Sequence, residues 1–154
     1  MRVLYSVELG NNYKISENQI DANYDIERVY YKFALIEELE NEKNTIILSQ
    51  SLEEGLELKD IIKIFNMANT NSILIIGEQY RDSSLLDELL NNRIYNGVFK
   101  DDVDSDYIIH LLNNERTIEE AKDYYCIAPD SIPNKEEMKN EKNGKVNLFK
   151  IFKN

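Results

Sequence analysis

The sequence predicts an α/β fold, a doubly wound parallel sheet of four or five strands with helices on both faces. Two short apolar runs, 45–48 and 73–76, are rich in β-branched residues, as is typical of strands covered on both faces. Segments with apolar residues at helical spacing lie between and after these runs. Because each parallel pair of strands needs a covering crossover, this alternation favours a parallel sheet.

The remaining strands are short or ambiguous in the sequence. A first strand is predicted at 2–7, where residues that favour β-structure alternate before a polar break. Residues 95–99 predict a short last strand. Residues 13–24 contain few apolar positions and are expected to hold either a degenerate strand or none, so the usual fifth strand is difficult to locate.

The helices follow from apolar spacing and from capping residues. The first is predicted to begin at Asp25, with an apolar face made of Ile26, Val29, Tyr30, Phe33 and Ile36. A second covers 58–68. A third is predicted to be capped by Ser84 with Asp87, and a fourth to begin at Asp104 or Ser105. Thr117 with Glu120 forms a capping box that opens a helix over 118–125.

Composition limits the partners and the compartment. The 154 residues suffice for one domain with an ordinary core, and 29 acidic against 18 basic residues give a net charge of -11. This charge repels phosphate backbones, so nucleic acid is not expected as a partner. The single cysteine, Cys126, excludes an internal disulfide, fits a reducing compartment and is expected to be a buried structural thiol. The apolar run before Glu8 is too short for a signal peptide or a membrane span, which favours a cytoplasmic protein.

Three segments are predicted along the chain. Residues 1–127 form the α/β domain, 128–144 a polar linker and 145–154 a tail with three lysines and no acidic residue. As a helix, the tail would lie on a membrane or dock in a groove; as a strand, it would begin a further domain. Terminal disorder is the third alternative.

Ligands of open α/β sheets bind beyond the carboxyl ends of the strands, where this sequence places Glu8, Ser49, Gln50, Gly77 and Lys100. The arrangement resembles a response-regulator receiver domain, which implies acids after strand 1, a phosphate-accepting Asp after strand 3, a hydroxyl residue after strand 4 and a Lys after strand 5. Glu8 and Lys100 match this pattern. Ser49 or Gln50 stands at the acceptor position and Gly77 replaces the hydroxyl. We therefore expect a degenerate pocket with no catalytic residue, metal or cofactor.

A second resemblance concerns residues 94–127, where an acidic loop and a helix precede the element Arg-Thr-x-x-Glu-Ala-x-x-Tyr-Tyr. This stretch resembles the atypical receiver domains at the front of tight-adherence pilus localisation proteins and related ATPases of the MinD/ParA type. The resemblance implies a homodimeric module that localises or regulates a partner ATPase in pilus assembly or signal transduction. The chain has no Gly-Lys-Thr phosphate loop, so it is either a fragment or a stand-alone relative.

The resemblance also implies an interface, because receivers usually dimerise through helix 4, strand 5 and helix 5. The corresponding residues are Leu89, Asn92, Arg93, Tyr95, Asp106, Tyr107 and His110. The pairs Tyr30–Tyr31 and Tyr124–Tyr125 are expected to be exposed or half-exposed aromatics suited to protein contacts.

An alternative function is the sensing of a small molecule or a divalent cation at the acidic carboxyl edge of the sheet. The candidate residues for it are Glu53, Glu54, Glu78, Asp101, Asp102 and Asp104. Acidic loops also serve solubility alone, so the sequence leaves both interpretations open.

Overall fold

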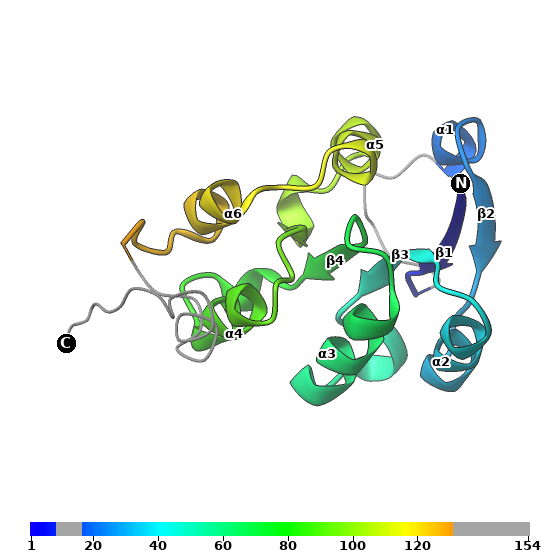
Figure 1. The fold of residues 1–154 in the computed structure, drawn as a ribbon, viewed down its shortest axis with the longest axis horizontal. Coiled ribbons are helices and arrows are strands. Elements are labelled where there is room, and N and C mark those ends of the chain that lie inside the picture. Colours follow the sequence, from blue (N-terminus) through cyan, green and yellow to red (C-terminus); the bar gives the residue numbers. More distant parts are fainter. Residues whose placement is uncertain (9–16, 131–154) are drawn as a thin grey trace, which may run out of the picture.

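The structure, a computed structural model, describes residues 1–8 and 17–130. Its sheet has five strands, all parallel, in the order β2-β1-β3-β4-β5 (Figure 1). This order is that of a flavodoxin-like doubly wound sheet and confirms the predicted fold class. The strands are β1 (Arg2–Ser6), β2 (Asp25–Arg28), β3 (Thr45–Ser49), β4 (Ile73–Ile76) and β5 (Gly97–Phe99).

Helices cover both faces of the sheet. They are α1 (Glu17–Asp21), α2 (Lys32–Asn41), α3 (Leu58–Met67), α4 (Ser84–Asn91), α5 (Ser105–Asn113) and α6 (Ile118–Tyr125). One core lies between the sheet and α2, α3, α4 and α6, and a second lies between the sheet and α1 with α5. In Figure 1, α6 lies beyond β5 at one end of the sheet, and β2 forms the opposite margin.

Alternation along the central strands divides their side chains between the two cores. Ile46 and Leu48 of β3 face the larger core, whereas Ile47 faces the smaller one, and all three are fully buried. Burying such a side chain stabilises the fold by about 1.5–3 kcal/mol. The continuous apolar runs of the sequence therefore reflect strands that are covered on both faces.

The helix predicted from Asp25 is wrong over its first part. Residues 25–28 form the edge strand β2, and α2 begins only at Lys32. The backbone N–H of Asp25 donates to the carbonyl of Met1 at 3.1 Å, and that of Val29 donates to the carbonyl of Tyr5 at 3.0 Å. Hydrogen bonding to β1 therefore decides the conformation of residues 25–28. The helical spacing of the apolar residues arises because a strand and a helix follow one another here. Phe33, predicted on the buried face, is 82% exposed.

The predicted caps have mixed outcomes. The capping box of α6 is confirmed, because Thr117 Oγ1 accepts from the Glu120 N–H at 3.1 Å and Glu120 Oε1 accepts from the Thr117 N–H at 2.8 Å. Helix α4, in contrast, has Ser83 rather than Ser84 at its N-cap. The Ser83 hydroxyl donates to the carbonyl of Tyr80 at 2.6 Å, so it closes the preceding turn and caps no N–H.

The C-terminal part of the domain brings one further correction. Cys126 is exposed rather than buried, and it is the C-cap residue of α6, with φ 61° in the left-handed region. The tail at 145–154 and the linker from residue 131 onward lie outside the described residues. In the part of the chain that the structure describes, no helix is long and apolar enough to span a membrane.

Candidate functional site

A pocket of about 260 Å³ lies where β3, β4 and β5 end. Three of the five residues predicted for the degenerate pocket, namely Gln50, Gly77 and Lys100, line it. Ser49 is fully buried at the end of β3. The other lining residues are Ser51, Glu54, Gly55, Leu56, Ile75, Gln79 and Tyr80. The structure therefore brings three of the five residues together at the strand ends, and Glu8 and Ser49 do not line the pocket.

Gln50, one of the two residues at the predicted acceptor position, joins the ends of two strands. Its Oε1 accepts from the Gly77 N–H at 3.1 Å, and its own N–H donates to the carbonyl of Ile75 at 2.9 Å. Gly77 also leaves room for Gln79, since a Cβ at position 77 would lie 2.3 Å from Gln79 Oε1. Two primary amides thus converge on Gly77, where a receiver would carry its hydroxyl side chain.

Glu8 reaches this region through a chain of hydroxyls. The Ser51 hydroxyl donates to Glu8 Oε2 and lies 2.9 Å from the Ser49 hydroxyl. The carboxylate of Glu8 therefore stands after the end of β1, bonded to a serine. Serine has no charge with which to gather Mg²⁺, so this trio lacks the clustered carboxylates of a phosphoryl-transfer site.

The loop after β3 has an unusual backbone. Glu53, Glu54 and Gly55 have successive φ values of 52°, 68° and 124°, all in the left-handed region. For a residue with a Cβ this conformation costs about 1–2 kcal/mol. Glu54 and Gly55 line the pocket, and strained backbone tends to gather at functional sites.

Four of the acidic residues predicted at this edge are bonded to groups of the protein itself, and two of them meet at Arg81. Glu53 accepts from the Lys32 N–H at 3.0 Å, Asp104 caps α5, and Glu78 and Asp102 are both paired with Arg81. Among the described residues, no group of three acidic, histidine or cysteine side chains is placed to hold a metal ion. Arg81 holds the pKa of Glu78 below its usual range, which keeps this carboxylate charged.

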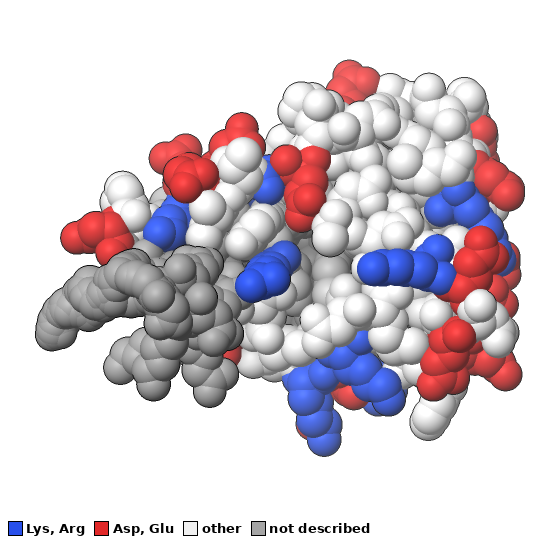
Figure 2. All heavy atoms as spheres, viewed as in Figure 1, with Lys and Arg blue, Asp and Glu red and all other residues white. Residues whose placement is uncertain are grey.

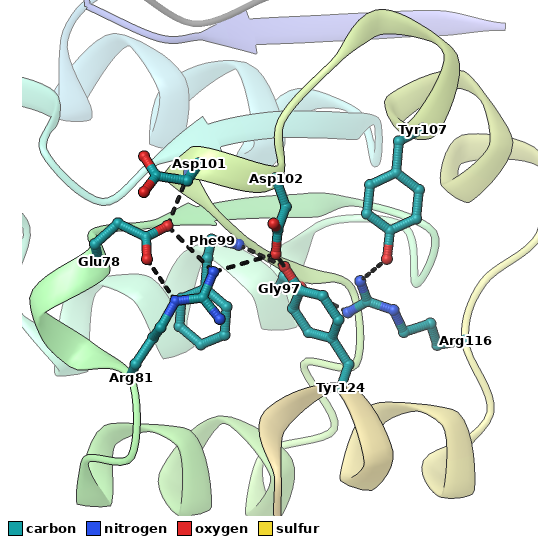
Figure 3. Close-up of polar contacts among 9 residues, drawn as sticks. All are labelled: Glu78, Arg81, Gly97, Phe99, Asp101, Asp102, Tyr107, Arg116 and Tyr124. Atoms are coloured by element: carbon teal, nitrogen blue, oxygen red, sulfur yellow. Dashed lines mark hydrogen bonds and ion pairs between the residues drawn. The ribbon is translucent and has the colours of Figure 1, made fainter.

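A stack of two arginines and two aromatic rings extends from this edge along β5 (Figure 3). The guanidinium of Arg81 lies 4.1 Å from the ring centre of Phe99, and Phe99 stacks on Tyr124 at 5.4 Å. The guanidinium of Arg116 lies 3.9 Å from the ring centre of Tyr124. Each cation–ring contact is worth about 0.5–2 kcal/mol, depending on burial. We call these four residues the arginine–aromatic stack.

Side chains from 116–125 satisfy the outer backbone groups of β5. The hydroxyl of Tyr125 accepts from the Gly97 N–H, and that of Tyr124 accepts from the Phe99 N–H, both at 2.9 Å. Arg116 Nη1 donates to the carbonyl of Gly97 at 2.6 Å and to that of the preceding Tyr95 at 3.0 Å. These are the groups that a further strand would engage, so the segment closes this edge of the sheet.

The element Arg-Thr-x-x-Glu-Ala-x-x-Tyr-Tyr therefore has a structural role in this chain. Its Tyr124 is half-buried, as the sequence predicted, but its Tyr125 is fully buried, so the prediction of an exposed or half-exposed side chain is wrong for Tyr125. Burial raises the pKa of both hydroxyls, and the Asp102 carboxylate raises that of Tyr124 further, so both stay protonated. The structural role of Arg116 was missed, although this residue opens the element that contains the two tyrosines.

The interface residues assigned by resemblance have different environments. Leu89 is fully buried in the core and is removed from this set. The Tyr95 carbonyl and the Tyr107 hydroxyl both accept from Arg116, and Asp106 accepts from Gln19 of α1 at 2.6 Å. Of the remaining three, Asn92 is half-buried, and Arg93 and His110 are exposed. The chain's own segment 116–125 thus occupies part of the predicted dimer face.

No protein-family model, no curated protein and no solved structure matches this chain. The fold and the pocket therefore define its class, a flavodoxin-like doubly wound α/β domain with a polar pocket at the carboxyl edge of the sheet.

Proposed function

We propose that this chain is a non-catalytic, receiver-like interaction module of the cytoplasm that works by binding other proteins. The observation that carries the proposal is the state of the acceptor position. Ser49 is buried, and the Gln50 amide is held by the Gly77 N–H, in a fold whose strand order is that of a receiver. Neither residue has the carboxylate needed for an acyl phosphate.

The resemblance of residues 94–127 supplies the proposed role. A homodimer of this module would localise or regulate a MinD/ParA-type ATPase or a pilus assembly machine. The net charge of -11 favours a partner with a basic contact surface, because complementary charge speeds association.

The test is incubation of the full chain with acetyl phosphate and Mg²⁺, followed by intact mass measurement and light scattering. We expect no phosphoryl adduct and no change in oligomeric state, because no described carboxylate stands at the acceptor position. An adduct that hydroxylamine removes would identify an acyl phosphate and would overturn the proposal.

A second candidate function is the sensing of a small polar molecule. The strained loop at Glu54 and Gly55, together with Lys100 and the Gln79 amide, gives the pocket groups of both charges and hydrogen-bonding side chains. Ligand binding stabilises the folded state by mass action, so a thermal-shift screen of nucleotides and amino acids tests this function. If none of these compounds raises the melting temperature, the sensing function is excluded.

A further inference from the structure

The pocket at the ends of β3, β4 and β5 is lined by buried and by exposed residues. Gln50 and Ile75 are buried, whereas Ser51, Glu54 and Lys100 are exposed, so the first two form its base and the others its mouth. Its volume of about 260 Å³ lies below the range of about 300–1,000 Å³ that is typical of pockets for drug-sized ligands. The pocket therefore suits a small metabolite.

Gln50 has unused hydrogen-bond donors at the base of this pocket. The Gly77 N–H needs an acceptor and donates to Gln50 Oε1, which fixes the orientation of the amide group. In the described part of the chain, Gln50 Nε2 donates to no protein group. Gln50 is only 9% exposed, and this nitrogen remains accessible. Its two N–H groups are therefore available to an acceptor oxygen of a ligand in the pocket.

The mouth of the pocket has one negative and one positive side chain. Among the residues that line the pocket, Glu54 and Lys100 are the charged ones. Glu54 has no hydrogen-bond or ion-pair partner within the described residues. Leu56, Ile75 and the ring of Tyr80 supply an apolar lining. A complementary ligand therefore has an anionic group, a cationic group and an apolar part.

We propose that this pocket binds a zwitterionic α-amino acid with an apolar side chain. The carboxylate of the amino acid accepts from Gln50 Nε2 and faces Lys100. Its ammonium group faces Glu54, and its side chain packs on Leu56 and Ile75. Hydrogen bonds to a charged group are stronger than those between neutral groups, so a carboxylate gains most from the Gln50 donors. The inference rests on the sensing function proposed above, for which it names the ligand class.

The charge of the whole protein also favours a zwitterion. The net charge is -11, and Figure 2 shows acidic side chains over α6 at one end of the molecule and along α2 at the other. This field repels ligands with a net negative charge, including phosphate esters. A zwitterion has no net charge, so it brings a carboxylate to Gln50 and Lys100 without that repulsion. A purely cationic ligand would bring no acceptor to the Gln50 donors.

Isothermal titration calorimetry of the full chain tests the ligand class. The probes are L-alanine, L-valine, L-leucine and L-methionine, followed by the N-acetyl and the amide derivative of whichever binds most tightly. The N-acetyl derivative lacks the cation and the amide lacks the carboxylate, whereas both keep the apolar side chain. We expect each derivative to bind about tenfold more weakly than the amino acid, as the loss of one charge-assisted hydrogen bond predicts.

A variant of Gln50 tests the base of the pocket. Gln50→Glu keeps an oxygen for the Gly77 N–H and replaces the two donors with a negative charge. We expect this variant to bind the amino acid about tenfold more weakly than the parent chain. Circular dichroism and chemical denaturation check that the variant is folded.

Variants of Glu54 and Lys100 test the mouth of the pocket. Glu54→Gln and Lys100→Met each remove one charge and are expected to weaken binding by about two- to fivefold, because both residues are exposed. The matched controls are Glu57→Gln and Lys59→Met, which alter an exposed ion pair outside the pocket. These controls are expected to leave the affinity unchanged.

Three outcomes would overturn the amino-acid site: none of the four amino acids binds, a derivative binds as tightly as its amino acid, or folded Gln50→Glu keeps the full affinity. If a nucleotide raises the melting temperature while no amino acid binds, the amino-acid inference fails and the sensing function stands. The non-catalytic function is separate from all of these results, because it fails only if acetyl phosphate yields an acyl phosphate adduct.

Discussion

The two edge strands of the sheet, β5 and β2, differ in the residues that surround them. An edge strand presents unpaired N–H and C=O groups, which invite pairing with another chain. At β5, Arg116, Tyr124 and Tyr125 satisfy these groups with side chains of the same chain. At β2 charged residues line the strand, and exposed aromatic residues follow it. The comparison shows that the β5 edge is closed by arginine and tyrosine side chains of the same chain, whereas the β2 edge is built of exposed and half-buried residues, three of the four charged.

The closed edge depends most on Tyr125. Its ring is buried against Ala121 and the sheet, and its hydroxyl both accepts from the Gly97 N–H and donates to the Ile94 carbonyl at 2.7 Å. We expect Tyr125→Ala to lower the free energy of unfolding by about 3–5 kcal/mol, as large truncations in cores do. Chemical denaturation measures this loss.

Tyr125→Phe is the matched control for the hydroxyl alone. It keeps the ring and leaves two buried backbone groups without their partner, so we expect a smaller loss of about 1–3 kcal/mol. Equal stability of Tyr125→Phe and the parent chain would mean that the β5 edge does not need these hydrogen bonds.

Arg116 should have the next largest effect. Its guanidinium is bonded to the carbonyls of Tyr95 and Gly97 and lies over the ring of Tyr124. Arg116→Met keeps most of the apolar stem and removes the donors, so we expect a loss of about 1.5–3 kcal/mol in denaturant unfolding. Arg116→Lys should recover only part of it, because an ammonium lacks the planar fork that reaches both carbonyls.

The central strands were predicted from the sequence, whereas the edge strand β2 was missed. From Thr45 to Phe99 the helices and strands follow their apolar patterns closely, because both faces of each central strand are buried. Edge strand β2 has one half-buried apolar residue, Ile26, among charged neighbours, so its pattern carries little strand signal. Its pairing with β1 is a long-range contact that local periodicity does not encode.

In the candidate site, the pocket residues at the strand ends were predicted from the sequence, whereas the role of Arg116 was not. Gln50, Gly77 and Lys100 line one pocket, since a parallel sheet brings the carboxyl ends of its strands together. The role of Arg116 was missed because its partners are backbone carbonyls 19 and 21 residues away in the chain. Only the fold brings such groups together.

The smallest effect on folding is expected at Phe33, which lies in the first turn of α2, after β2. Phe33 is 82% exposed and has little packing to lose, so Phe33→Asp should change the free energy of unfolding by less than about 0.5 kcal/mol in dilute protein. Chemical denaturation of the parent chain and the variant measures this difference. A loss above about 1 kcal/mol would mean that the Phe33 ring packs against the protein, contrary to its exposure.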